Sequence, residues 1–132
     1  MSFYPTLPNC PVGLLVVDYQ KIIEVHNSIM QDLSIPTPTS KELAKKANMS
    51  TSKFRNTFIK IFGTSVHQYY SHVRIEFAKE LLKDNKYNIE QIAYKVAFMR
   101  SQSFAKAFFN HTGQTASHYK TATLYSDKRE RQ

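Results

Sequence analysis

The polar side chains best suited to chemistry lie on one short stretch near position 50. Large apolar residues recur there at helical spacing and are expected to form a buried face: Phe54, Phe58 and Ile61. The opposite face, near the start of the expected helix, carries polar and basic side chains: Ser52, Lys53, Arg55 and Asn56. An arginine can bind guanine O6 and N7 with two hydrogen bonds, and an asparagine can bind adenine N6 and N7. Arg55 and Asn56 thus offer the chemistry that recognises base edges.

This stretch has a second copy. Three landmarks recur at an offset of 50 residues: Phe54/Phe104, Phe58/Phe108 and Gly63/Gly113. Ahead of them, Leu43-Ala44 matches Ile92-Ala93 at an offset of 49, so the second copy has one extra residue in its turn. Its exposed residues are again polar and basic: Arg100, Ser101, Gln102, Ser103 and Lys106. Each copy is expected to form a short helix, a tight turn and a longer helix, which is the helix-turn-helix plan.

The charge of the chain is concentrated where the repeat lies. Its 132 residues carry 18 basic and 10 acidic side chains, a net charge of +8 and a pI near 9.6. Residues 1–38 have a net charge of −2, whereas residues 39–132 have a net charge of +10. This excess favours a polyanionic partner, although charge alone does not say which one.

Other chemistries lack the residues they need. Cys10 is the only cysteine, which rules out an intrachain disulfide and a cysteine-based zinc site. The histidines show no metal-ligand spacing and are expected to be ordinary residues: His26, His67, His72, His111 and His118. Three glycines argue against a phosphate-binding loop, and no apolar run approaches the roughly 18 residues of a membrane span. We therefore expect no enzyme, cofactor, metal or membrane segment.

Helical spacing and helix-end signals predict an all-α chain of about seven helices. Capping boxes are expected to begin three of them: Thr39-x-x-Glu42, Ser65-x-x-Gln68 and Asn88-x-x-Gln91. Gly63 and Gly113 are expected to end the longer helix of each copy. No alternating run is long enough to predict a strand. The expected architecture is two helix-turn-helix subdomains joined by a long linker helix.

The expected organisation has three parts. Residues 1–17, with prolines at three of the first eleven positions, form a lead-in that is flexible or a remnant of an upstream domain. Residues 18–121 form one double helix-turn-helix domain. Its segments are a first helix-turn-helix at about 40–62, a linker helix at about 66–84 and a second helix-turn-helix at about 89–112. After a last turn or short helix at 115–121, residues 122–132 form a basic mobile tail.

Residues 39–121 combine several specific stretches. These are Lys41-Glu42-Leu43-Ala44, Met49-Ser50-x-x-x-Phe54-x-x-x-Phe58-x-x-x-Phe62-Gly63, Val73-Arg74-Ile75-x-x-Ala78-x-x-Leu81-Leu82, Ile89-x-x-Ile92-Ala93, Ser103-Phe104-x-x-x-Phe108-x-x-x-x-Gly113 and Tyr119-Lys120. Together they resemble the DNA-binding domain of the AraC/XylS family of bacterial transcription regulators. The resemblance implies two recognition helices that enter successive major-groove segments of double-stranded DNA. The expected linker helix would be about 28 Å long, comparable to a duplex turn of ~34 Å.

The resemblance also implies roles for individual residues. By alignment with the family, the base-reading positions of the first recognition helix are Ser52, Arg55 and Asn56, and those of the second are Ser101, Gln102 and Lys106. Contacts to the DNA backbone are expected from Lys53, Lys60, Arg100, Asn110, His111 and Lys120. The chain departs from the family pattern at three positions: Ala97 replaces a glycine of the second turn, Ala116 a proline and Lys120 an arginine. Ala97 must therefore either be strained or adopt a different turn.

The expected function is that of a sequence-specific transcription regulator, acting as an activator and contacting RNA polymerase. Its expected location is the bacterial cytoplasm, at the nucleoid. An effector ligand, if there is one, would bind a missing upstream domain. The chain is either a fragment of a longer regulator or a stand-alone regulator. The alternative is a protein-interaction module or antagonist that keeps the fold without specific DNA binding.

Overall fold

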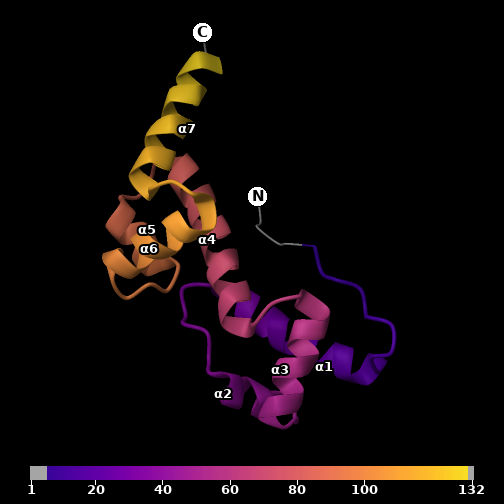
Figure 1. Cartoon of the computed structure of the whole chain (residues 1–132). Helices are drawn as coiled ribbons and strands as arrows, with labels where there is room; N and C mark the ends of the chain where they lie inside the picture. The colour runs from indigo at the N-terminus through magenta and orange to yellow at the C-terminus, as the bar shows by residue number, and fades with distance from the viewer. Residues whose placement is uncertain (1–5, 131–132) are drawn as a thin grey trace. The chain divides into compact units, whose positions relative to one another are not determined.

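The computed structural model describes the backbone of residues 6–130 and the side chains of residues 6–123. This part of the chain consists of helices and connecting segments, with no strand, so the predicted all-α fold is confirmed. The seven helices are α1 (Val16–Met30), α2 (Ser40–Lys46), α3 (Thr51–Phe62), α4 (Val66–Asp84), α5 (Ile89–Lys95), α6 (Ser101–Thr112) and α7 (Ala116–Glu130) (Figure 1). The predicted linker helix at 66–84 coincides with α4.

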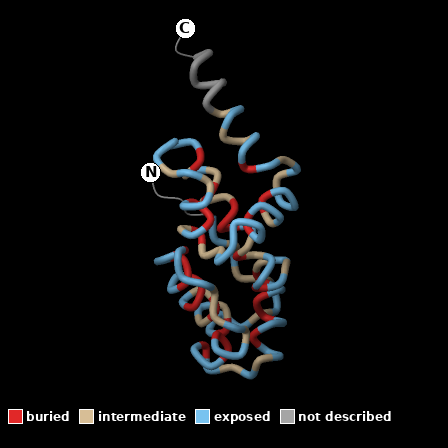
Figure 2. The backbone as a smooth tube through the Cα atoms, turned by 90° about the vertical axis from the view of Figure 1, so that its left-hand side faces the viewer, coloured by how far each residue is buried: buried red, intermediate tan, exposed pale blue. Residues whose placement is uncertain are grey.

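The chain divides into two compact units. The first unit ends at Tyr70 and the second begins at Ser71, so the first turn of α4 belongs to one unit and the rest of the helix to the other. Each unit contains one helix-turn-helix, made of α2 and α3 in the first unit and of α5 and α6 in the second. Along the helices, buried residues alternate with exposed ones, as amphipathic sequences require (Figure 2).

An aromatic cluster fills the first unit. Phe54 and Phe58 of α3 are fully buried, and the rings of Phe58 and Phe62 stack with their centroids 4.4 Å apart. Tyr70 of α4 is 1% exposed and lies against the ring of Phe58, at 5.9 Å between centroids. Such buried rings are the largest single contributors to a core of this size. They therefore set the orientation of α3, whose opposite face must point to solvent.

The core of the second unit follows the same plan with fewer rings. It joins one face of α4 to α5, α6 and the start of α7, through Ile75, Ala78, Leu82, Ile92, Ala93, Val96, Phe104, Phe108 and Ala116. Phe104 and Phe108 take the places that Phe54 and Phe58 have in the first unit, as the repeat predicted. The buried stripe of α6 thus lies toward the core, and its polar stripe is left exposed.

The predicted helix caps are present in different degrees. Asn88 and Gln91 form a full capping box, with N···O distances of 2.8 and 2.9 Å. Thr39 accepts from the Glu42 N–H at 3.2 Å, which is the expected hydroxyl contact of its box. At the start of α4, Ser65 accepts from the Gln68 N–H, but the Gln68 side chain accepts instead from the hydroxyl of Thr64. Gly63 and Gly113 end α3 and α6 with φ of 79°, the left-handed conformation that favours glycine.

The last helix is longer than predicted. The sequence predicted a last turn or short helix at 115–121 and a tail beyond it, whereas α7 spans Ala116–Glu130. The Thr115 hydroxyl accepts from the His118 N–H at 3.1 Å and so begins the helix. Residues 116–130 contain neither glycine nor proline, so no local signal ends the helix earlier. Residues 1–5 of the predicted lead-in and residues 131–132 of the predicted tail lie outside the described residues.

Candidate nucleic-acid interface

The first helix-turn-helix owes its tight turn to two small or adaptable residues. Ala44 is 1% exposed and lets α2 and α3 pack closely. The chain then turns at Asn48, with φ of 55°, while the Met49 N–H donates to the Ala44 carbonyl at 2.9 Å. Asparagine tolerates this left-handed conformation better than other residues with a side chain. Ser50 then caps α3 by accepting from the Lys53 N–H at 3.1 Å.

The exposed face of α3 carries the predicted contact residues of the first unit. Ser52, Lys53, Arg55, Asn56 and Lys60 are all exposed. Phe54, Phe58 and Ile61 are buried on the opposite side. The helix contains no acidic residue, so nothing on it repels an anion. The structure therefore presents the five side chains together on one polar and basic face, while their contacts to bases and phosphates stay predictions.

One of these residues has an unforeseen partner in the same unit. The Lys53 ammonium lies 3.4 Å from a carboxylate oxygen of Asp18, near the start of α1. The Asp18 side chain is only 10% exposed, whereas that of Lys53 is 52% exposed. This ion pair ties α1 to the first turn of α3. Sequence patterns do not reveal it, because the two residues are 35 positions apart and only the packing of the two helices brings them together.

The second helix-turn-helix repeats the turn of the first, but an alanine occupies its left-handed position and the turn is one residue longer. The Phe98 N–H donates to the Ala93 carbonyl at 2.9 Å, just as Met49 donates to Ala44. Ala97 occupies the position of Asn48 and has φ of 66°. Of the two outcomes expected for Ala97, the structure shows the strained one, because an alanine Cβ is unfavourable in this conformation. The one extra residue of the second turn follows, and Arg100 begins α6 without a side-chain cap.

Replacing Ala97 with glycine is expected to stabilise the protein by about 0.5–1 kcal/mol. Glycine removes the strained Cβ, although it also gains conformational freedom in the unfolded chain. Urea unfolding followed by circular dichroism measures the change. Ala107→Gly, in the interior of α6, is the matched control and is expected to destabilise by about 1 kcal/mol. A destabilised Ala97→Gly variant would show that this turn is not strained.

The exposed face of α6 carries the predicted contact residues of the second unit. Arg100, Ser101, Gln102, Lys106, Asn110 and His111 are all exposed. Phe104 and Phe108 are buried on the other side, and α6 also contains no acidic residue. The structure thus brings the predicted set onto one face of this helix as well. Their contacts to bases and phosphates likewise stay predictions.

Two residues predicted to contact the DNA backbone already have partners within the second unit. The Lys120 ammonium donates to the Tyr87 carbonyl at 3.3 Å and is half-buried. The His111 Nε2 lies 3.3 Å from the Ser71 hydroxyl oxygen. Burial, and secondly the nearby charge of His72, lower the pKa of His111, which favours its neutral ring. The Lys120 ammonium keeps its charge but is already engaged with a carbonyl, whereas the lowered pKa of His111 reduces the charge that its ring can bring to a phosphate.

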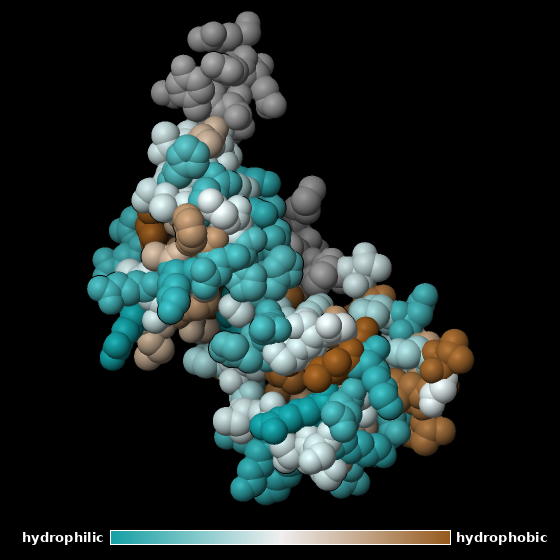
Figure 3. Space-filling view, viewed as in Figure 1, coloured by the Kyte–Doolittle hydropathy of each residue, from teal (hydrophilic) through white to brown (hydrophobic). Residues whose placement is uncertain are grey.

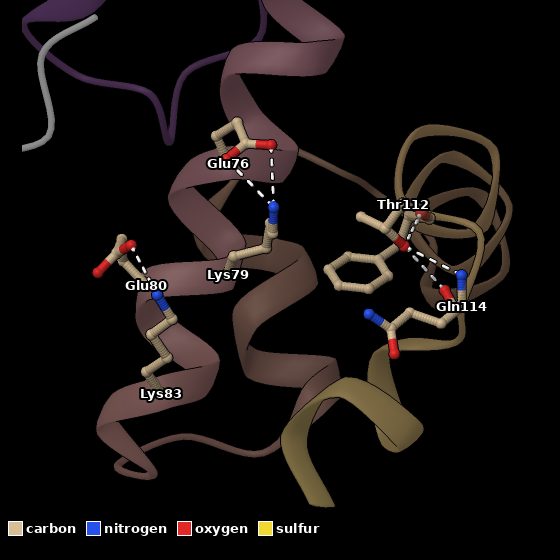
Figure 4. Close-up of polar contacts among 7 residues, drawn as sticks. Glu76, Lys79, Glu80, Lys83, Thr112 and Gln114 are labelled. Carbon is tan, nitrogen blue, oxygen red and sulfur yellow. Dashed lines mark hydrogen bonds and ion pairs between the residues drawn. The ribbon is translucent and has the colours of Figure 1, made fainter. Parts of the chain in front are cut away.

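Two of the three acidic residues of α4 are paired with lysines on the same helix. Glu76 lies 3.2 Å from the Lys79 ammonium, and Glu80 lies 3.4 Å from that of Lys83 (Figure 4). In the same view, the Thr112 hydroxyl donates to the carbonyls of Phe108 and Gln114 at the end of α6. These contacts neutralise local charge and satisfy helix-end carbonyls, so they are structural.

The described residues hold neither a metal-binding cluster nor a membrane-spanning helix. Within the described residues, histidine, cysteine, aspartate and glutamate side chains form no group of three or more that could hold a metal ion. No helix in the same part of the chain combines the length and apolar character of a membrane span. The candidate interface consists of the exposed faces of α3 and α6, because these faces carry the predicted contact residues.

Comparison with known proteins identifies the class to which these two units belong. The family model described as a helix-turn-helix domain matches residues 43–122, more than half of the chain. The transcriptional regulator AlkR of Acinetobacter baylyi is 35% identical over 82 residues, which are 62% of this chain and 27% of that protein. The chain spans between about a quarter and a half of the length of the curated relatives it matches.

Solved structures agree with this class. The DNA-binding domain of AdpA, crystallised with a target DNA, has a TM-score of 0.75 at 22% identity and covers 85% of this chain and 98% of that one. An AraC-type regulator from Chromobacterium violaceum has a TM-score of 0.71 at 21% identity and covers 80% and 93%. These structures share the fold, and the family model that matches residues 43–122 shows that the chain belongs to the AraC-type helix-turn-helix family that the sequence resembles.

Proposed function

We propose that the chain is a sequence-specific DNA-binding transcription regulator that inserts α3 and α6 into successive major-groove segments. The observation that carries this proposal is the pair of helix-turn-helix units, each with an exposed, acid-free face on its second helix. The net charge of +10 over residues 39–132 supports a polyanionic partner. The likeness to a domain solved with its target DNA supports DNA as that polyanion.

The residue roles belong to the same proposal. We assign base reading to Ser52, Arg55 and Asn56 on α3 and to Ser101, Gln102 and Lys106 on α6. Backbone contacts are assigned to Lys53, Lys60, Arg100, Asn110, His111 and Lys120, with Lys53, His111 and Lys120 weakened by their internal partners. Residues 18–121 form the DNA-binding domain.

We also propose a role for the protein in the bacterial cell. It activates transcription, contacts RNA polymerase and works in the bacterial cytoplasm at the nucleoid. An effector, if the regulator has one, binds a domain upstream of residue 18. The regulators among the curated relatives, which are longer than the matched region, support the role in transcription.

The test is selection of binding sites from a random duplex library by the purified chain, at two salt concentrations. We expect a bipartite site with half-sites about one helical turn apart, roughly 34 Å. The affinity should fall steeply with salt, because each phosphate contact releases counterions. Binding that depends on salt but enriches no sequence would contradict the proposal and leave only a basic surface.

A second candidate function is a protein-interaction module that keeps the fold without specific DNA binding. The features that favour it lie in the second unit, where Ala97 is strained, α6 lacks a side-chain cap and Lys120 is engaged with Tyr87. The same selection experiment separates the two candidates. An interaction module would enrich no sequence at either salt concentration.

A further inference from the structure

Each recognition helix exposes one large apolar side chain. Ile59 on α3 is 46% exposed, and Phe109 on α6 is 54% exposed. The two residues are 50 positions apart, which is the offset of the repeat, so they occupy the same place in the two units. Neither side chain is needed to fill the core of its unit, because other residues of its helix do so.

Both side chains lie on the polar face of their helix. Ile59 follows Arg55 by four positions and Asn56 by three, and Phe109 follows Lys106 by three. Residues three and four positions apart on a helix are neighbours on its surface. Ile59 and Phe109 are therefore adjacent to the residues assigned to base reading, on the side away from the buried phenylalanines. On the first unit in Figure 3, apolar side chains appear as brown patches among teal ones.

A single exposed apolar residue needs no explanation, since folded proteins have many. The repeat makes this pair different. The other exposed positions of the two helices carry different chemistry in the two copies: Ser52/Gln102, Lys53/Ser103, Arg55/Ala105, Asn56/Lys106 and Lys60/Asn110. Only at 59/109, among these exposed positions, do both copies have a large apolar side chain. A shared apolar group on faces that otherwise differ indicates a shared contact.

The surroundings indicate the chemistry of that contact. Arg55 lies beside Ile59, Lys106 lies beside Phe109, and neither helix has an acidic residue. A partner must therefore be anionic and also present apolar groups at the helix surface. The DNA major groove does both, because phosphates line it and the 5-methyl groups of thymine project into it. A protein partner would need matching acidic residues around an apolar patch, and it becomes the alternative outcome of the test.

We infer that Ile59 and Phe109 each contact the 5-methyl group of a thymine and so favour thymine at one position of each half-site. This inference rests on the proposed function, since it requires α3 and α6 to lie in the major groove. It adds one specificity determinant to each helix. It also gives both half-sites a common feature, although their hydrogen-bonding residues differ.

The test replaces each thymine of the selected duplex, one at a time, with deoxyuridine, which lacks only the 5-methyl group. For the unaltered chain, we expect binding about three- to five-fold weaker at one position in each half-site, as loss of one buried methyl group predicts. Ile59→Ala should abolish the loss at the first position and Phe109→Ala that at the second. Val12→Ala is the control, because Val12 is fully exposed and lies outside both helices. Circular dichroism checks that each variant is folded.

The outcomes separate this inference from the proposed function. If a sequence is selected but no deoxyuridine weakens binding, the function stands and the inference is wrong. The same holds if the alanine variants keep the full sensitivity to deoxyuridine. Alanine variants that bind every duplex as the unaltered chain does would point to a protein contact instead. If no sequence is selected at all, the proposed function fails and the inference fails with it.

Discussion

Replacing Arg55 with alanine is expected to weaken binding to the selected duplex by about 1–3 kcal/mol, a factor of roughly five to 150. Arg55 is exposed on α3 and lies on the same face as Asn56, so its guanidinium is free to make a bidentate contact with guanine. The loss should be confined to one base pair. Binding to duplexes that already lack the preferred base there should hardly change. Competition binding with single-base variants of the selected duplex measures this pattern.

Lys60→Ala is the matched control for this prediction. Lys60 lies on the same helix and is also exposed, but it is assigned to a phosphate. Its loss should weaken binding to all duplexes alike and reduce the slope of log K against log salt by about 1. If Arg55→Ala weakened all sequences equally, Arg55 would be a backbone contact and its role as a base reader would be wrong.

The stability of the protein is expected to fall by about 2 kcal/mol between pH 7 and pH 5 because of His26 alone. His26 is 3% exposed, and its Nδ1 lies 2.7 Å from the Tyr70 hydroxyl oxygen. Burial lowers the pKa of His26 from 6.5 to about 4. The unfolded chain therefore takes up this proton near pH 6.5, whereas the folded chain resists it until about pH 4. The stability contributed by the neutral ring is complete above pH 6.5 and is lost as the pH falls toward 4.

Urea unfolding of the chain at pH 7 and pH 5 measures this loss, and His26→Leu is the variant that isolates it. Leucine suits the ring's apolar neighbours, which include Phe62 and Tyr69 at centroid distances of 5.1 and 5.9 Å. The variant should lose much less stability on acidification than the unaltered chain. Part of the pH dependence should remain, because the pKa of His111 is also lowered by burial. An unchanged pH dependence in His26→Leu would mean that His26 takes up its proton without cost in the folded state.

The two units follow one plan but are stabilised unequally. In the first, Asn48 suits its left-handed turn, Ser50 caps α3 and the Asp18–Lys53 ion pair holds the first turn of the helix. In the second, Ala97 is strained at the equivalent turn, and α6 begins at Arg100 without a side-chain cap. An arginine at the N-cap position lacks the capping hydrogen bond, which is worth about 1 kcal/mol. It places a positive charge at the start of α6 instead. We expect the start of α6 to open more readily than that of α3.

Much of the fold could be predicted from the sequence, because helix formation depends on near neighbours. The phenylalanine spacing predicted α3 and α6 and their buried faces, and the glycines at 63 and 113 predicted their ends. The offset of the repeat predicted the extra residue of the second turn. The exposure of Arg55 and Asn56 followed from their positions opposite the buried stripe. A local pattern could also have revealed Ile59 and Phe109, since both lie outside that stripe.

The sequence by itself thus determined the helices, the repeat and the two polar faces, through contacts within three or four residues. Only the tertiary structure decided which distant groups meet. It placed His26 beside Tyr70, 44 positions away, and Asp18 beside Lys53. It also forced Ala97 into a conformation that its own preference opposes, because the packing of α5 against α6 requires that turn. Partners and strain of this kind depend on the free energy of the whole core, which outweighs local preference and leaves no periodic signal in the sequence.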